Sequence, residues 1–199
     1  MSALRYDDFP FGFSWTIDEP LERTSHAIAD DDGRVWLVDP TDEADALERA
    51  AGLGTPAGVI QLLDRHGRGC ADIAGRLGVP HVKAWEHAPA GPFEVVRVLV
   101  HRGWREVALW WPAHRVLVVP ETLGTSPVWA PGADPAGVHP MLRLLPPRAL
   151  AAFEPDHLLV GHGAGVHGPQ AAAAPRQALA HARSDLPRML AKVPGMLRR

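Results

Sequence analysis

Two short apolar runs, each followed closely by a histidine, constrain the fold of this chain more than any other feature. The first covers residues 59–63, and His66 follows it before a helix-like segment begins at Cys70. The second covers residues 158–160 and leads through a glycine into His162. Short apolar runs bounded by turn residues predict buried strands, and mixed folds place functional residues just beyond the carboxyl ends of such strands. The chain is therefore expected to be an α/β protein in which His66 and His162 are candidate site residues.

The remaining periodicities predict an alternating first half and a strand-rich second half. Residues 25–29 and 34–38 are expected to form a hairpin, and Thr41 or Asp42 is expected to cap a helix that ends near Gly52. The other predicted strands cover residues 59–63, 82–85, 95–100, 107–111, 116–119 and 158–160, and the other predicted helices cover Cys70–Leu77, a stretch near 147–153, and residues 170–192 with interruptions at Pro175 and Pro187. We expect one domain over residues 1–199.

Composition limits the partners and the location of the protein. A formal net charge of -3 leaves no electrostatic footprint for nucleic acid, so nucleic acid is not an expected partner. The single cysteine, Cys70, cannot form an internal disulfide, and the first residues lack the apolar stretch of a signal peptide, which favours a cytoplasmic location. No segment offers the roughly 20 apolar residues of a membrane span, so no membrane association is expected. A small-molecule ligand is the expected partner, and the oligomeric state stays open.

The order of the segments resembles the metallo-β-lactamase fold superfamily. In that family a buried strand ends in His-x-His-x-Asp-His, a helix follows, and a later strand ends in a Gly-His turn. Residues 35–40 are similar to the family's early strand that ends in aspartate, and residues 161–163 are similar to its late turn, so the resemblance covers nearly the full chain. It implies a four-layer αβ/βα sandwich, and it implies that the His66 and His162 rings lie within roughly 8 Å of each other.

The same resemblance implies that most of the family's metal ligands are missing. When the strand ends are superposed by counting back from Gly78, His66 takes the last histidine of the motif. The other three positions then fall on Gln61, Leu63 and Arg65. Leucine cannot bind a metal, and arginine stays cationic at physiological pH and repels one. A two-metal site is therefore not expected, and neither Gln61 nor Leu63 should contact a metal ion.

Other positions of the family pattern keep residues that can coordinate. Glu121 stands where the family has the aspartate that bridges two metals, and His162 stands at the late Gly-His turn. His101 or Arg102 lies near the family's middle histidine, and spacing does not decide between them. His66, Glu121 and His162 can thus supply the three protein ligands of a single catalytic zinc.

Two functions follow from the resemblance and its departures. The leading one is a non-hydrolytic binding or regulatory protein whose cleft holds His66, Arg65, Glu121, His162 and His101, with no metal and no cofactor expected. The alternative is a single-metal hydrolase of an ester, thioester or phosphoester, with zinc held by His66, Glu121 and His162. A third and more general hypothesis gives the fold only an oligomerisation or interaction surface.

Arg65 carries a more specific hypothesis. Where the family has a carboxylate that faces a cation, this arginine is expected to pair with Glu121 and to replace the second metal with its own charge. The competing interpretation is that Arg65 is a solvated loop residue.

Two further features have open alternatives. The glycine-rich segment 161–168 is either an anion-binding turn or a tight connection that needs positive φ angles. Cys70 is either a reactive thiolate near a helix start or a packed apolar residue.

Overall fold

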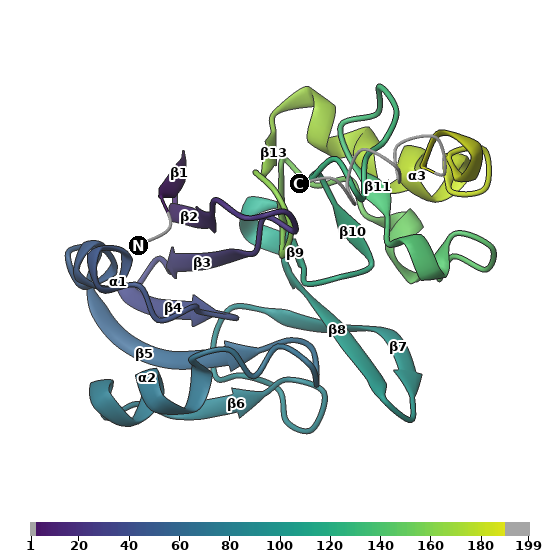
Figure 1. Ribbon diagram of the computed structural model, residues 1–199. Helices are drawn as coiled ribbons and strands as arrows, with labels where there is room; N and C mark the ends of the chain where they lie inside the picture. The colour runs from purple at the N-terminus through teal and green to yellow at the C-terminus, as the bar shows by residue number, and fades with distance from the viewer. Residues whose placement is uncertain (1–2, 190–199) are drawn as a thin grey trace.

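Two β-sheets that pack face to face, with helices on their outer faces, form the body of the protein (Figure 1). The computed structural model describes residues 3–189. Over this range the first sheet has six strands in the spatial order β1-β2-β3-β4-β5-β6, antiparallel as far as β4 and parallel from β4 to β6. These strands are β1 (Leu4–Phe9), β2 (Gly12–Ile17), β3 (Thr24–Ala29), β4 (Arg34–Val38), β5 (Thr55–Gln61) and β6 (His81–Lys83).

Within the described residues the second sheet has five strands in the order β13-β12-β9-β8-β7; β12 and β9 are parallel, and the other neighbours are antiparallel. They are β7 (Glu94–His101), β8 (Trp104–Trp111), β9 (Val116–Val119), β12 (His157–Val160) and β13 (Val166–His167), with a separate ribbon of β10 (Leu123–Gly124) and β11 (Gly137–Val138). The helices that lie wholly within the described residues are α1 (Ala44–Ala51), α2 (Cys70–Leu77) and α3 (Pro169–His181), and the 3-10 turns there are η1 (Pro112–His114), η2 (Pro140–Leu142) and η3 (Ala149–Ala152). None of the helices described in residues 3–189 has the length and apolar character needed to cross a bilayer.

Three apolar layers explain why the chain forms a four-layer sandwich. On β4, Val35 and Leu37 pack with α1 and α2, whereas Trp36 and Val38 pack between the sheets, because side chains alternate along a strand. β9 repeats the alternation, with one face packed against α3 and the other against the first sheet. The αβ/βα sandwich implied by the sequence is therefore confirmed.

Parallel pairing brings the candidate site residues to one edge of each sheet. In the first sheet β4 lies parallel to β5, so Asp39 and the segment that leads to His66 leave from the same edge. In the second sheet β9 lies parallel to β12, and Glu121 and His162 each follow a paired strand end by two residues. Sheet topology alone therefore places these side chains near one another.

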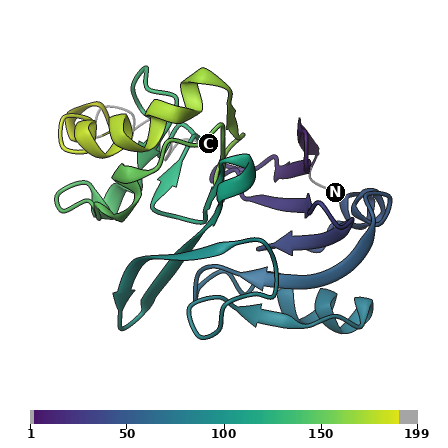
Figure 2. The ribbon, with the colours of Figure 1, turned by 180° about the vertical axis from the view of Figure 1, so that it is seen from behind.

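The hairpin of β7 and β8 connects the sheets beside this edge. The backbone N–H of Val107 donates to the carbonyl oxygen of Leu62 over 3.0 Å, and Leu63 forms a β-bridge with Glu106. Seen from behind, the β7–β8 hairpin extends away from the rest of the second sheet (Figure 2). The segment between β5 and His66 is therefore anchored on both sheets.

Arg68 ties the two halves of the sandwich together. One of its guanidinium nitrogens donates to the carbonyl oxygens of Thr24 (2.6 Å) and Asp39 (3.0 Å), and the other donates to that of Gly161 (3.4 Å). The backbone N–H of Thr24 also donates to the Gly161 carbonyl over 2.8 Å. The turn that carries His162 is thus fixed to the ends of β3 and β4.

The expected helix cap at Thr41 or Asp42 is wrong. α1 begins at Ala44, and its first turn has no side-chain cap. The hydroxyl of Thr41 instead accepts a hydrogen bond from Trp15 over 2.9 Å, and Asp42 forms an ion pair with Arg76 of α2. Both side chains are therefore bonded to residues distant in the sequence and do not cap the helix.

The second half differs from its prediction in two helices. α3 passes through Pro175 without a break, because this buried proline lies on the alanine-rich face that packs on the sheet, which offsets its lost hydrogen bond. The stretch near 147–153 forms only the short turn η3. The helical region predicted to reach residue 192 lies partly outside the described residues. Strands β1 and β2, which carry no clear alternating pattern, were not predicted.

Candidate functional site

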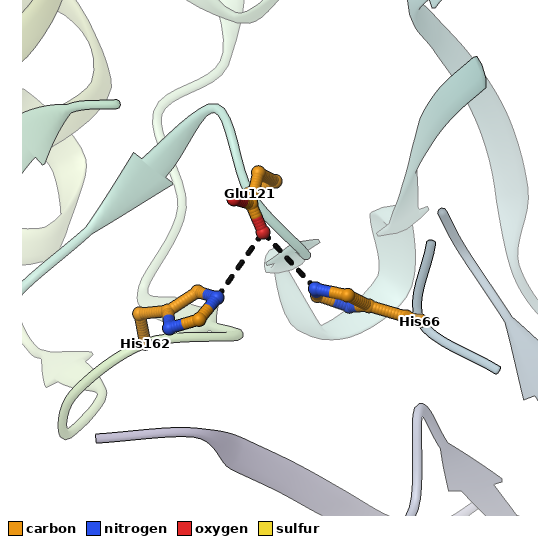
Figure 3. A group of neighbouring side chains, drawn as sticks. All are labelled: His66, Glu121 and His162. Carbon is orange, nitrogen blue, oxygen red and sulfur yellow. Dashed lines mark hydrogen bonds and ion pairs between the residues drawn. The ribbon is translucent and has the colours of Figure 1, made fainter. Parts of the chain in front are cut away.

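His66, Glu121 and His162 form a buried cluster where the two sheets meet (Figure 3). Oε2 of Glu121 lies 3.0 Å from His66 Nε2 and 3.1 Å from His162 Nε2. The imidazole centroids are 5.8 Å apart, which confirms the proximity expected from the sequence. The three residues are 7%, 8% and 4% exposed, so solvent screens their interactions weakly.

Asp39 determines which nitrogen of His66 carries the proton. Its Oδ2 lies 2.8 Å from His66 Nδ1, and its Oδ1 accepts the backbone N–H of Leu62 over 2.9 Å. An ionised carboxylate only accepts, so His66 donates from Nδ1 and the neutral ring directs the lone pair of Nε2 at Glu121. Asp39 has a positive φ of 44°, a strained conformation for a residue with a side chain.

His162 is held in the same tautomer by a different partner. Its Nδ1 lies 2.8 Å from the carbonyl oxygen of Leu21, which can only accept, so this nitrogen carries the proton. The ring stacks on Trp129, with centroids 4.2 Å apart and planes 10° from parallel. A side chain at position 161 would collide with the chain at Pro120, because a Cβ there would lie 2.0 Å from the Pro120 carbonyl oxygen, so Gly161 is required before His162.

These tautomers leave two imidazole lone pairs and one carboxylate oxygen facing each other. Such acceptors repel one another at 3.0 and 3.1 Å unless a cation lies among them or both rings gain a proton. In a tetrahedral zinc site, bonds of about 2.0 to 2.2 Å separate ligand atoms by about 3.3 to 3.6 Å. One potential ligand atom from each of the three residues lies within 4.8 Å of the other two. The residues therefore fit a divalent metal ion held by two nitrogens and one oxygen.

Glu121 is held in its charged form. Burial alone would raise the pKa of this carboxyl, but the hydrogen bond from His139, together with those from His162 and His66 when their Nε2 atoms are protonated, holds the pKa well below its usual range. The backbone of the residue is fixed as well, because Trp129 Nε1 donates to the Glu121 carbonyl oxygen over 2.8 Å. The oxygen ligand is thus both anionic and positioned.

His139 is a third histidine at the cluster, and the sequence did not reveal it. Its Nε2 lies 3.2 Å from Oε1 of Glu121, the oxygen that does not contact His66 or His162. The residue follows β11, which pairs with β10 just after Glu121. A predicted ribbon between these two short strands would have placed His139 beside Glu121, but strands of two residues leave no periodic signal.

Arg65 does not pair with Glu121, so the hypothesis that this pair replaces a second metal is wrong. The exposed guanidinium of Arg65 lies over Trp104, 4.0 Å from the ring centroid, whereas the Glu121 carboxylate contacts histidines. A cation–π contact at an exposed site contributes about 0.5 to 1 kcal/mol and leaves the arginine hydrated. A pair with the buried Glu121 would require its desolvation.

The other residues that the resemblance matches to metal-ligand positions have internal partners or lie elsewhere. Gln61 donates from Nε2 to the Leu63 carbonyl oxygen over 2.8 Å, and its Oε1 lies 3.1 Å from His81 Nε2. Leu63 is fully buried. His101 is exposed at the end of β7, where it pairs with Trp104 across the hairpin, outside the buried cluster. That Gln61 and Leu63 contact no metal stays a prediction.

The glycine-rich turn holds an anion that belongs to the protein itself. Asp7 Oδ2 accepts the backbone N–H of Gly165 over 2.8 Å and lies 3.2 Å from His167 Nε2. Gly163 has a positive φ of 96°. Both alternatives for the turn therefore contribute, since it is a strained connection that binds a carboxylate of β1.

Cys70 packs as an apolar residue. It is fully buried, and burial raises the pKa of its thiol far above the usual value. Of the two alternatives, the packed apolar residue is therefore confirmed, because the start of α2 packs against the first sheet, where a thiolate would be desolvated.

Neither the protein-family models nor the curated proteins include a match to this chain. Solved structures do resemble it. The DIM-1 metallo-β-lactamase exposed to ceftazidime has a TM-score of 0.58 at 13% identity over 92% of this chain and 97% of that chain. A metallo-β-lactamase from Erythrobacter litoralis has a TM-score of 0.57 at 10% identity over 91% and 92%. TMB-1 has a TM-score of 0.52 at 10% identity over 92% and 97%. At these identities the likeness concerns the fold, and the fold of this protein is the metallo-β-lactamase fold.

Proposed function

We propose that this protein binds one divalent metal ion, with zinc as the first candidate, through His66, Glu121 and His162, and that it hydrolyses an ester, thioester or phosphoester. The observation that supports this most is the convergence of two Nε2 lone pairs on Oε2 of Glu121. Three protein ligands with one open position are what a catalytic zinc requires.

A metal ion at this position would act as a Lewis acid on a carbonyl or phosphoryl oxygen and would lower the pKa of a water molecule. The protein supplies the rest of the chemistry. Two neutral imidazoles and a single carboxylate leave a divalent ion with net positive charge. Asp39 orients His66, and the indole of Trp129 orients His162. Such partners around a metal ligand typically raise metal affinity by 10- to 100-fold.

A binding or regulatory protein without hydrolysis is the second candidate. It is favoured by Gln61 and Leu63, where the family's first metal would bind, because one is satisfied by internal hydrogen bonds and the other is fully buried. The second candidate predicts no substrate turnover. It also predicts no bound metal if the site binds its ligand without an ion.

Elemental analysis of the purified protein, followed by titration with Zn²⁺ and Co²⁺, tests the metal site. We expect one ion per chain in the wild type and loss of binding in His162→Ala and Glu121→Gln. His101→Ala is the matched control, since this exposed histidine lies outside the cluster, and it should bind normally.

Hydrolysis is tested on ester, thioester and phosphoester substrates with and without a chelator. Activity that the chelator removes and the metal restores supports the first candidate. Stoichiometric metal without turnover on any substrate class favours the second. A wild type that takes up no metal contradicts the proposal.

A further inference from the structure

We infer that His139 is a positioning residue that leaves Glu121 only one oxygen for the metal and thereby limits the site to a single ion. The inference rests on the proposed metal site and goes beyond it, because it assigns a role to a histidine that is not itself a ligand. It also explains how a carboxylate at a position that bridges two metals in the family can serve one.

The proton on His139 is placed differently from those on the two candidate ligands. The backbone N–H of Met141 lies 3.2 Å from His139 Nδ1, and an N–H can only donate, so Nδ1 must accept. The neutral ring therefore carries its proton on Nε2. Nε2 lies 3.2 Å from Oε1 of Glu121, close enough for its N–H to donate to that oxygen. His139 thus offers Glu121 a proton where His66 and His162 offer lone pairs.

The ring of His139 has little freedom to change this arrangement. Its centroid lies 5.0 Å from that of Trp104 and 5.3 Å from that of Trp129, both in edge-to-face contact. Its backbone N–H donates to the carbonyl oxygen of Thr122 over 3.0 Å, which ties the residue to the segment that carries Glu121. The side chain is only 13% exposed. The donor is therefore fixed before any ion binds.

A fixed donor on Oε1 excludes a bridging carboxylate. In a two-metal site each oxygen of the bridging carboxylate faces a cation, whereas here Oε1 faces an N–H group. A second ion at Oε1 would meet the positive end of that N–H. The Trp104 ring that packs against His139 also carries the cationic guanidinium of Arg65 on its face. The hydrogen bond also stops the carboxylate from rotating, so Oε2 stays directed at His66 and His162.

The position of the proton can be measured without a metal. In metal-free protein, the ¹⁵N shifts of the ring nitrogens should show His139 with its proton on Nε2 and none on Nδ1, whereas His66 and His162 carry a proton on Nδ1 whether or not Nε2 is also protonated. A His139 ring protonated on Nδ1 overturns the inference, whether or not the protein binds metal.

Co²⁺ titration then tests the consequence. We expect His139→Ala to bind Co²⁺ about 10- to 100-fold more weakly than the wild type, with an altered visible spectrum, because Glu121 is free to rotate. His139→Gln, whose amide can still donate to Oε1, should recover most of the affinity. His181→Ala is the control, since His181 also pairs with a carboxylate, Asp134, but on the exposed surface.

The outcomes separate this inference from the proposed function. A wild type that binds one Co²⁺, with His139→Ala equal to it in affinity and spectrum, overturns the role of His139 and leaves the metal site standing. A wild type that binds two ions overturns the limit to one. A wild type that binds none contradicts the proposed function, and the ¹⁵N shifts still decide the proton on His139. Thermal melts identify any variant that fails to fold.

Discussion

At the scale of single residues, the partner on the far side of each imidazole determines what the near side can do. His66 faces a carboxylate, His162 faces a carbonyl oxygen, and His139 faces a backbone N–H. The first two partners accept and leave Nε2 as a lone pair, whereas the third donates and leaves Nε2 as an N–H. Three histidines around one carboxylate thus divide into two candidate ligands and one donor.

Asp39→Asn should disturb this division at His66. The new amide can donate to Nδ1, which would move the His66 proton to Nε2 and close the lone pair that faces Glu121. We expect Zn²⁺ affinity to fall by about 10- to 100-fold, as measured by competition with a chromophoric chelator.

The control for this change is Asp42→Asn. Asp42 lies three residues after Asp39, and the substitution removes one charge from its exposed ion pair with Arg76. This variant should bind Zn²⁺ like the wild type, because this exposed ion pair is screened by solvent and does not touch the cluster. Equal Zn²⁺ affinities for the two variants would show that Asp39 does not set the tautomer.

The sequence predicted the residues of the cluster better than their partners. His66, His162 and Glu121 were found because the resemblance matches them to family positions that follow apolar runs. The roles of Asp39 and His139 depend on which atoms of distant segments meet, which no local pattern encodes. The pairing predicted for Arg65 was wrong for the same reason, because Trp104, whose ring lies under the Arg65 guanidinium, comes from the opposite sheet.

At the scale of elements, β8 holds the strand end that carries Glu121. The buried carboxylate of Glu106 accepts the backbone N–H of Thr122 over 2.7 Å, its hydroxyl over 2.8 Å, and the indole N–H of Trp104 over 2.9 Å. Burial raises the pKa of Glu106, and these donors oppose the shift. The segment after β9 is therefore fixed by a side chain from its neighbour in the sheet.

Glu106→Ala should lower the free energy of unfolding by at least about 3 kcal/mol, because it leaves several buried donors without an acceptor. Urea unfolding followed by tryptophan fluorescence measures the loss. Glu94→Ala, on the exposed end of β7, should change the midpoint little. The role assigned to Glu106 is untenable if the two variants unfold at the same urea concentration.

Elements with a clear repeat of apolar residues were predicted from the sequence. Very short strands and strands without such a repeat were not. α2 and β9 have the predicted bounds because their apolar spacing and their bounding residues agree. β1 carries charged residues on an edge strand, and β2 is buried along most of its length, so neither alternates clearly. The two-residue strands β10 and β11, which carry His139 to the cluster, are set by tertiary contacts alone.

At the scale of the whole molecule, a buried histidine away from the cluster gives the stability a pH dependence. His26 lies in the first sheet with its Nδ1 2.8 Å from Ser14 Oγ. Burial lowers the pKa of His26 from 6.5 to about 3; Asp39 and Asp7 oppose this shift and Arg68 adds to it. The unfolded chain binds the proton near pH 6.5 and the folded chain does not. Stability is therefore full above pH 6.5 and declines as the pH falls toward 3.

The decline should approach about 1.4 kcal/mol per pH unit below pH 6 for this one group. His26→Asn, which keeps a hydrogen-bonding partner for Ser14, should remove that slope between pH 6 and about 4.5, above the range in which carboxylates with lowered pKa values begin to contribute. Denaturant unfolding at a series of pH values measures both proteins. Parallel curves for the two would rule out His26 as the source.

The overall architecture was predicted more reliably than individual side-chain contacts. Alternating apolar faces on β4 and β9 require a partner layer on both sides, and helices at α1, α2 and α3 supply the outer ones. Patterns of this kind average over many residues, so an error at one strand does not change the fold. The cluster depends on single side chains, and one wrong partner changes its chemistry.

The bonds that tie Thr24 to the turn before and after His162 also set an order of events during folding. Thr24 Oγ donates to the Gly163 carbonyl oxygen across 139 positions of sequence, and Arg68 donates to Gly161 from the same side. Contacts this distant in the chain close late, because the entropy of the intervening loop must first be lost. His66 and His162 belong to the two segments that these contacts join. A Co²⁺ ion added during refolding should therefore give its absorption only in the slowest phase, and would time the docking of the two halves separately from the formation of either sheet.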